Sequence, residues 1–277
     1  MSEPQSKVQS LEGIINFSKY PFQDPKSDGY GRLLQECRSK LDHNGACEFT
    51  DFLTSEGLLG LIAESKELAK NAYFNTVNGN AYLEATDMTL PEDHPRRMTE
   101  DTSLGVIAYD EYPANAILRR IYEYEPLMNF IGAVLGLKSI YRYADPMGGL
   151  NLSVMKDGDY LRWHFDQTDF VTSLAIQSAD VGGEFEFVPM VRNEQNENYD
   201  GVRQVLKGTH LGIIKIANTP GTLVLFKGRY SIHRVSKIHG PEPRLIGLLA
   251  YDERPDVNST DHLRKMRYGR TSPYQSK

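Results

Sequence analysis

The sequence predicts an α+β protein that is mainly β, a jelly roll buttressed by helices from the N-terminal half of the chain. Two observations carry this prediction. Before residue 137 apolar residues recur at helical spacing, whereas residues 138–252 consist of short alternating apolar runs separated by Gly, Pro, Asn and Asp. About eight short strands with such turns are typical of a β-sandwich or barrel of the jelly-roll type. Helices that precede the strands in the chain are expected to pack on one face of the sheets.

Three segments of the N-terminal half are predicted to be helical. Residues 31–42 and 55–71 repeat apolar residues every three or four positions, and Ser55 can cap the second segment. Residues 114–136 are largely apolar and are interrupted near Pro126, which cannot continue a helix.

We expect one folded domain with an arm before it. Residues 1–30 are polar and turn-like, which predicts a loosely ordered arm, and residues 31–277 are expected to form a single domain. That domain is expected to comprise helical support and a substrate loop (31–137), the jelly-roll core (138–252) and a C-terminal tail (253–277). The tail is basic and polar, so we expect it to be solvated, with a lid over a site as the alternative.

Two polar segments are long enough to bear on function. Residues 76–103 contain Pro91 and Pro95 and are predicted to be an irregular loop; loops of this length are disordered or functional. Residues 190–204 are also polar, and we expect them to form a loop at the barrel mouth that can cover a substrate.

Composition excludes several classes of protein. Hydrophobic residues make up 40% of the 277 residues and charged residues 25%, which is ordinary for a globular domain. The net charge is −6 and no basic stripe is interleaved with aromatic residues, which argues against nucleic acid as a partner. No apolar run approaches the ~18 residues of a membrane span, and no apolar leader begins the chain, so we expect no membrane partner and a cytoplasmic location. Cys37 and Cys47 are expected to be buried free thiols, and the oligomeric state is left open.

The run RWHFDQTDF contains a candidate pair of metal ligands, His164 and Asp166. Residues i and i+2 of a strand point to the same face, so both side chains can reach one ion while Phe165 points the other way. Trp163 should also point away from His164 and pack in the core. Taken alone, a His-x-Asp triplet is a weak signal, because such triplets arise by chance.

A third ligand strengthens the prediction. His233 follows a glycine turn and a hydrophobic strand in the run GTLVLFKGRYSIHRV. His164, Asp166 and His233 together would form the facial arrangement of two histidines and one carboxylate that binds non-haem Fe(II) for oxygen chemistry. His210 is a competing third ligand, but it lies in a turn-rich stretch.

Arg244 is a candidate anion-binding residue. It lies eleven residues after His233 (244 − 233) in the apolar run GPEPRLIGLLAY. A guanidinium inside an apolar strand needs a partner, and a dicarboxylate co-substrate is one that arginine binds in bidentate fashion. The alternative is a salt bridge to a carboxylate of the protein.

The order of these features resembles the Fe(II)/2-oxoglutarate-dependent dioxygenases over residues 138–252. The resemblance implies a double-stranded β-helix, an Fe(II) cofactor, and 2-oxoglutarate and O2 as co-substrates. The segment GGEFEF looks like the prolyl-hydroxylase-like branch of that superfamily. A narrower resemblance, to the free amino-acid (lysine-type) hydroxylases and radical halogenases, is carried by the segments ADPMGGLN, WHFDQTDF, GGEFEFVP, HRV and PRLIGLLAYDERP.

Asp166 decides which reaction the resemblance implies. The halogenases have Gly or Ala at this position, which opens a corner for chloride, whereas this chain keeps the carboxylate. The resemblance therefore implies hydroxylation of an unactivated C–H of a free amino acid, lysine or another basic one, or of a similar small polar metabolite, with release of succinate and CO2. The alternatives are a peptidyl or protein hydroxylase of the prolyl-hydroxylase-like type and a non-catalytic jelly-roll metal-binding protein.

The chain departs from the family pattern at the co-substrate site. Many members have Arg-x-Ser there, but Arg244 is followed by Leu245 and Ile246. Another side chain would have to replace the serine, and the candidates on a preceding strand are Asn151, Tyr141 and Tyr143.

Substrate contacts are less well defined by the sequence. An amino acid needs a cationic group for its carboxylate and anionic groups for its amine. The candidates are His94, Arg96 and Arg97 for the carboxylate, and Asp169, Glu184 and Glu186 for the amine. For each of them an ordinary role, as a surface charge or a turn cap, is the alternative.

Overall fold

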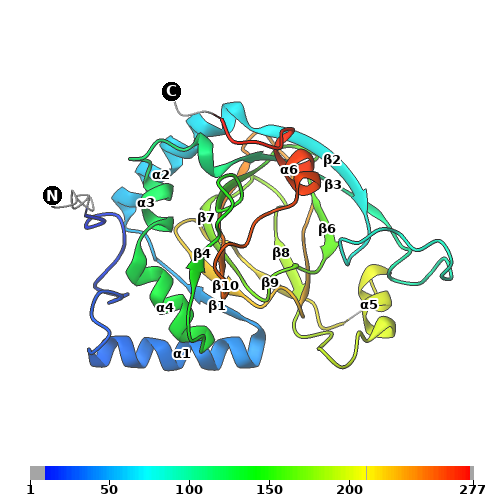
Figure 1. Cartoon of the computed structure of the whole chain (residues 1–277), viewed down its shortest axis with the longest axis horizontal. Helices are drawn as coiled ribbons and strands as arrows, with labels where there is room; N and C mark the ends of the chain where they lie inside the picture. Colours follow the sequence, from blue (N-terminus) through cyan, green and yellow to red (C-terminus); the bar gives the residue numbers. More distant parts are fainter. Residues whose placement is uncertain (1–9, 210, 275–277) are drawn as a thin grey trace.

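The structure is a computed structural model that describes residues 10–209 and 211–274. Two antiparallel sheets face each other and helices cover the outer side of the larger sheet (Figure 1). The large sheet contains, in spatial order, β1 (Ala46–Phe49), β10 (Leu223–Phe226), β7 (Val171–Gln177), β12 (Arg244–Leu249), β5 (Leu150–Met155), β3 (Glu100–Ile107) and β2 (Tyr73–Gly79). The small sheet contains β6 (Leu161–His164), β11 (Ile232–Val235), β8 (Phe185–Val188) and β9 (Ile214–Ile216). A further pair joins β4 (Tyr141–Arg142) to β13 (Tyr251–Asp252). The predicted jelly roll is confirmed.

One face of the large sheet packs against the N-terminal helices. Alternate residues such as Leu152 and Leu245 are fully buried in one cluster with Phe130 and Leu118 of the helices. Gly247 allows this close approach, because a Cβ atom there would lie 2.8 Å from Cδ1 of Leu118. The helices are α1 (Asp28–Asn44), α2 (Ser55–Leu68), α3 (Ile117–Tyr122) and α4 (Glu125–Leu135), with short 3-10 turns η1 (Ala69–Asn71) and η2 (Tyr109–Glu111).

The predicted helix over 114–136 is divided into α3 and α4. Pro126 lies in the first turn of α4, where its missing N–H leaves no bond unmade. Gly136 ends α4 in the left-handed conformation that favours glycine.

The other strand faces enclose the space between the sheets, which we call the interior. Met155 of β5 packs there against Val235 of β11 and the nearby Ile238. Phe226 of β10 packs against Phe187 of β8, with ring centroids 5.2 Å apart. The interior is therefore lined largely by apolar side chains, which keep water away from any polar group among them.

The predicted loosely ordered arm is wrong for residues 10–27. Leu11, Ile15 and Phe22 are buried in the main core, and the ring of Phe22 lies 4.9 Å from that of Phe130 on α4. The apolar residues of this segment are interrupted by Gly13 and Pro21 and form no long periodic pattern, so their burial was not visible in the sequence.

The polar segments also hold more regular structure than predicted. The ends of the predicted loop over 76–103 belong to β2 and β3, which pair with each other. Because β2 is an edge strand with every residue at least partly exposed, it has no buried alternation to reveal it. Residues 190–204 lead into α5 (Tyr199–Leu206), which packs Val202 and Val205 against the outer face of the small sheet. The helical part of that segment therefore lies outside the small sheet and not over the interior.

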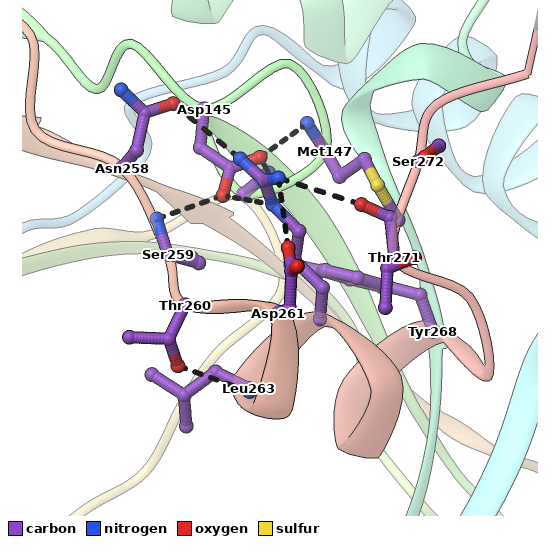
Figure 2. A network of polar contacts seen from close by, with 12 residues as sticks. Asp145, Met147, Asn258, Ser259, Thr260, Asp261, Leu263, Tyr268, Thr271 and Ser272 are labelled. Carbon is purple, nitrogen blue, oxygen red and sulfur yellow. Dashed lines mark hydrogen bonds and ion pairs between the residues drawn. The ribbon is translucent and has the colours of Figure 1, made fainter.

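The C-terminal segment is not a solvated tail over residues 253–274. It forms α6 (Asp261–Tyr268), which contacts β2 and β3 and lies beside them in Figure 1. Figure 2 shows its anchor, the fully buried carboxylate of Asp145, which accepts hydrogen bonds from the backbone N–H groups of Met147 (2.8 Å) and Ser259 (2.9 Å). Arg264 adds an ion pair to Asp145 at 3.0 Å. Over the described residues, no helix combines the length and apolar character needed to cross a membrane.

Candidate metal centre and anion pocket

His164 and His233 face each other across the small sheet. They are direct partners in the antiparallel pairing of β6 and β11, and their ring centroids are 4.1 Å apart. Nδ1 of each imidazole is hydrogen-bonded to a backbone carbonyl two residues earlier in the chain. The distance is 2.9 Å from His164 to the carbonyl of Arg162 and 3.0 Å from His233 to that of Ser231. With Nδ1 as the donor, Nε2 keeps its lone pair and is directed toward the neighbouring ring, as metal-ligating histidines require.

A β-bulge in β6 sets the direction of His164. His233 pairs with His164, and the next pair is Val235 with Leu161. A two-residue advance along β11 is therefore matched by a three-residue advance along β6. Leu161 and His164 consequently both face the interior. Trp163 lies in the outer cluster with α5, which confirms its predicted core role.

Asp166 completes the cluster just beyond β6. Its backbone N–H donates to the carbonyl of Gly228 (3.1 Å), which turns the carboxylate back toward the histidines. Oδ1 lies 3.8 Å from Nε2 of His164, and Oδ2 lies 3.5 Å from Nε2 of His233. The candidate ligand atoms of the three residues lie within 4.8 Å of one another, a spacing that one metal ion can bridge. Phe165 points into the outer cluster, as predicted.

The carboxylate has an unmet demand for a partner. Oδ2 of Asp166 is buried, and its nearest polar neighbour in the described residues is Nε2 of His233 at 3.5 Å, which has no proton to donate when Nδ1 carries it. A buried oxygen of this kind is costly unless a cation or donor satisfies it. The donor set of two imidazole nitrogens and one carboxylate, with further corners open, fits a divalent transition metal such as Fe(II).

Protonation at the site favours metal binding. Burial, followed by the neighbouring His233, lowers the pKa of His164 to about 3, so its imidazole is neutral at physiological pH. Burial by itself would raise the pKa of Asp166, but His233 and His164 lower it below its usual value. A metal therefore meets a neutral imidazole at His164 and an ionised carboxylate at Asp166, the forms that coordinate it.

Arg244 supplies a buried positive charge without a protein counter-ion. Its side chain is 6% exposed, and burial lowers its pKa to about 10, which still leaves it charged at neutral pH. Within the described chain no carboxylate comes within ion-pair distance, and Nε has no hydrogen-bond partner. The contact recorded for Nη1 is the sulfur of Met155 at 3.8 Å. The alternative of a salt bridge to the protein is therefore not met by these residues.

Arg244 and the metal cluster lie at different positions along the strands that enclose the interior. Arg244 is paired with Met155, whose cluster includes Leu161 and Val235, and we call this the Arg244 end. His164 and His233 lie farther along the same two strands, at what we call the triad end. The unpaired guanidinium and the metal cluster therefore belong to the same interior.

The three residues predicted to replace the missing serine do not lie at Arg244. Asn151 is four residues from Met155 along β5, about 13 Å. Its amide donates to the carbonyls of Met147 and Leu150, and its Oδ1 accepts from Tyr268. Tyr141 is 38% exposed on the separate β4–β13 pair, and Tyr143 pairs with Ala250 beyond the far end of β12.

Ser153 is the hydroxyl that sequence analysis missed. It lies on β5 directly opposite Ile246, the position that holds serine in the Arg-x-Ser pattern. It shares the interior face of β5 with Met155, because the two are separated by one residue. The sequence could not reveal this relation, since it depends on the register between two strands about 90 residues apart.

Two of the predicted amine contacts, Glu184 and Glu186, point away from the interior. Glu186 pairs with Arg234 (2.6 Å) and Lys215 (3.1 Å), and Glu184 pairs with Lys215 (2.6 Å). Arg234 directly follows His233, so its side chain is on the opposite, outer face of the small sheet. Asp169 is held by an exposed ion pair to Arg229.

The predicted carboxylate contacts lie on the outer side as well. Arg96 stacks on the ring of Tyr82, 5.1 Å from its centroid, and pairs with Glu84 at 3.1 Å. Tyr82 in turn packs on Phe165, with 5.3 Å between ring centroids, in the outer cluster. Arg97 donates to the carbonyl of Leu90 (2.6 Å). His94 packs against Tyr199 of α5, 4.5 Å between ring centroids, and His210 lies outside the described residues.

Comparison with solved structures identifies proteins of the same fold. An oxidoreductase of the 2OG-Fe(II) oxygenase family from Burkholderia pseudomallei aligns with a TM-score of 0.51 and 15% identity, over 81% of this chain and 93% of that one. A prolyl hydroxylase from Trichoplax adhaerens, solved with a peptide fragment of hypoxia inducible factor, aligns at 0.53 and 15%, over 83% and 96%. The carbocyclase SnoK of nogalamycin biosynthesis, described as α-ketoglutarate dependent, aligns at 0.54 and 14%, over 90% and 96%. These likenesses show that the fold is that of the 2-oxoglutarate oxygenases.

Comparison at the level of sequence identifies the family. No curated protein matches the chain. The model of the family described as HalD, Halogenase D, matches residues 31–267, which is most of the chain and includes the three candidate metal ligands and Arg244. The chain therefore belongs to the Halogenase D family.

Proposed function

We propose that the protein is an Fe(II)- and 2-oxoglutarate-dependent oxygenase that hydroxylates an unactivated C–H of a free amino acid or a similar small polar metabolite. The observation that carries the proposal is that the same interior contains a carboxylate without a cation and a guanidinium without an anion. Oδ2 of Asp166 needs a cation and Arg244 needs an anion. Iron and 2-oxoglutarate would meet both demands at once.

The roles of the residues follow from their positions. His164, Asp166 and His233 would hold the iron through Nε2, a carboxylate oxygen and Nε2. Arg244 would bind the distal carboxylate of 2-oxoglutarate, with the hydroxyl of Ser153 as a second donor from the neighbouring strand. When bound, the iron supplies the oxygen-activating chemistry that drives decarboxylation of 2-oxoglutarate and oxidation of the substrate.

Asp166 favours hydroxylation over halogenation. Its carboxylate would be a metal ligand where a halogenase leaves room for a halide, and it fills the space beside Gly228. The apolar interior around His233, where Phe226 lies 4.9 Å away and Phe185 5.5 Å away between ring centroids, would protect the reacting groups from water.

The experiment is a screen for substrate-triggered succinate release. The iron-loaded enzyme is supplied with 2-oxoglutarate and O2, together with each of the standard L-amino acids or with prolyl peptides, and products are identified by mass. We expect an amino acid to stimulate succinate release and to gain one oxygen atom. His233→Ala should abolish the reaction, whereas His239→Ala, at an exposed histidine beyond the same strand, should not. A chlorinated product would contradict the role of Asp166, and hydroxylation of peptides alone would contradict the substrate class.

A further inference from the structure

A cavity of about 270 Å³ lies outside the small sheet, away from the interior. It is enclosed by β6, by the segment 98–100 and by the C-terminal end of α5. Much of its wall is apolar and includes Met98, Trp163, Val205, Leu206 and Ile213. Its polar lining comprises Thr99, Glu100, Arg162 and Arg234. An apolar wall with a few polar groups is the usual composition of a small-molecule site.

The β-bulge in β6 explains why two consecutive side chains, Arg162 and Trp163, line this cavity. Leu161 and His164 both face the interior, so the two residues between them are turned to the outer side of the sheet. The strand therefore has the metal cluster on one side and the cavity on the other. A ligand in the cavity would not be the compound that the metal oxidises, because the sheet lies between them.

Arg162 brings a buried positive charge to the cavity. Its side chain is 7% exposed, and over residues 10–209 and 211–274 no carboxylate lies within ion-pair distance of it. Nε donates to the carbonyl of Asn80 (3.4 Å), and Nη1 donates to the carbonyl of Val77 (3.2 Å) and to Oγ1 of Thr102 (2.9 Å). Nη2 makes no hydrogen bond within the same residues. A guanidinium that is buried to this extent favours an anionic partner.

The free nitrogen of Arg162 faces the cavity. A Cβ atom on Gly79 would lie 2.7 Å from Nη2 and 3.3 Å from Cζ, so Nη2 is the atom of the guanidinium nearest to this glycine. Gly79 and Arg162 both line the cavity. In contrast to Nε of Arg244, Nη2 of Arg162 is not shut off from solvent. The absence of a side chain at Gly79 thus leaves space for a ligand beside Nη2.

The other charges of the lining favour a ligand with a single negative charge. Arg234 lies over Trp163, with its guanidinium carbon 4.7 Å from the ring centroid, and its charge is met by Glu186 at 2.6 Å. Glu100 is an exposed part of the lining and would repel a second negative charge. One cation without a carboxylate partner therefore remains beside an apolar wall.

We propose that this cavity binds a small monocarboxylate with a compact apolar body, and that Arg162 binds its carboxylate. The carboxylate would accept a charge-assisted hydrogen bond from Nη2, and the apolar body would pack against Trp163 and Leu206. The volume is below the roughly 300 Å³ at which pockets for drug-sized ligands begin, which favours a small aromatic or branched aliphatic acid. This site goes beyond the proposed function and requires neither iron nor 2-oxoglutarate.

The test uses the fluorescence of Trp163, the single tryptophan of the chain, which lines the cavity. The full-length protein, loaded with Fe(II) and 2-oxoglutarate in the absence of O2, is titrated with benzoate. Benzamide supplies the same apolar body without the charge, and acetate supplies the charge without the body. The visible charge-transfer band of the bound iron and 2-oxoglutarate is recorded in each titration and reports whether the interior stays occupied.

Three variants are compared with wild type. Arg162→Met removes the proposed anion-binding group, and Glu100→Gln removes the repelling charge at an exposed position. Glu253→Gln is the matched control, because Glu253 is an exposed carboxylate that does not line the cavity. Circular dichroism shows whether each variant is folded.

We expect benzoate to change the fluorescence of Trp163 to saturation and to bind at least about 10-fold more tightly than benzamide or acetate, while the band persists. Arg162→Met should weaken benzoate by about 10- to 100-fold, the usual effect of losing a hydrogen bond to a charged group. Glu100→Gln should strengthen it by about 2- to 5-fold, the size of an exposed charge interaction. Glu253→Gln should behave like wild type.

The proposal is overturned if benzoate leaves the fluorescence unchanged, if benzamide or acetate binds as tightly as benzoate, or if benzoate abolishes the band. It is also overturned if neither Arg162→Met nor Glu100→Gln changes the affinity, and Glu100→Gln decides alone if Arg162→Met does not fold. Absence of the band from wild type would instead contradict the proposed function, and the fluorescence of Trp163 would still test the cavity.

Discussion

A Cβ atom on Gly228 would overlap Oδ2 of Asp166, so the glycine provides the space in which the third candidate metal ligand lies. The φ angle of Gly228 is not in the left-handed region, so an alanine there would meet no backbone strain. Glycine is therefore required because a larger side chain would collide with the Asp166 carboxylate, not because of its backbone conformation.

Replacing Gly228 by alanine should displace Asp166 and weaken metal binding. We expect a loss of about 10- to 100-fold in iron affinity, as seen when groups that position metal ligands are altered. Iron titration followed by the charge-transfer band measures it. Gly31→Ala is the matched control, because nothing lies within 4 Å of a Cβ atom there and the residue is helical. Equal iron affinity in the two variants would contradict the role of Gly228.

Replacing Arg244 by methionine should impair the use of 2-oxoglutarate without lowering the free energy of unfolding. The unpaired charge is unfavourable in the unliganded protein, so its removal should leave the free energy of unfolding unchanged or increase it. The KM for 2-oxoglutarate should rise at least about 10-fold. Chemical denaturation and succinate-release kinetics measure the two effects.

Arg162→Met is the contrasting variant. Arg162 is also buried, but its guanidinium donates to the carbonyl of Val77 (3.2 Å) and to Oγ1 of Thr102 (2.9 Å). Its loss should destabilise the fold by about 1–3 kcal/mol, because buried acceptors lose their donor. If Arg244→Met destabilised the protein as much as Arg162→Met, Arg244 would be a structural residue.

Ser153 should share the binding of 2-oxoglutarate with Arg244. Ser153→Ala is expected to raise the KM for 2-oxoglutarate by about 3- to 10-fold, the net value of one ordinary hydrogen bond. Because Ile246 lies directly opposite, Ile246→Ser in the same protein should restore part of the affinity. If the KM for 2-oxoglutarate does not change in either variant, the hydroxyl of Ser153 does not contact 2-oxoglutarate.

Asp145 should make the attachment of α6 sensitive to acid. Burial tends to raise its pKa, but hydrogen bonds from Met147, Ser259 and Arg264 lower it below the usual value. A lowered pKa in the folded state means that this stabilisation is complete above about pH 4, the pKa of an unfolded aspartate, and is lost as pH falls through the folded value.

Asp145→Asn should therefore reduce the free energy of unfolding by about 2 kcal/mol at neutral pH, and the difference from wild type should shrink in acid. Denaturation at several pH values measures it. Asp261→Asn, which removes an exposed partner of the same Arg264, should have a much smaller effect. A difference for Asp145→Asn that does not change with pH would show that packing, and not charge, is responsible.

The cluster of candidate metal ligands and the class of fold could be predicted from the sequence because their signals are local. His164 ends a strand and Asp166 follows two residues later, and the strands themselves alternate clearly. The prediction of His233 needed only its place after a glycine-led strand. Arg244 was predictable because a charge inside an apolar run is unusual wherever the strand lies.

The parts that failed depend on register, edges and tertiary packing. Ser153 acquires its relation to Arg244 only through the pairing of β5 with β12. Glu184 and Glu186 alternate correctly, but the sequence does not say which face of β8 is outside. The anchoring of the C-terminal segment was hidden because Arg264 and Arg270 find their partners far away in the chain.

The central claim is that His164, Asp166 and His233 bind iron together with 2-oxoglutarate held by Arg244. Its most direct test is the visible spectrum of the full-length protein under anaerobic conditions after addition of Fe(II) and then 2-oxoglutarate. We expect a weak metal-to-ligand charge-transfer band that requires both additions and is absent from His233→Ala. A wild-type protein that shows no band, or a band that survives His233→Ala unchanged, would contradict the claim.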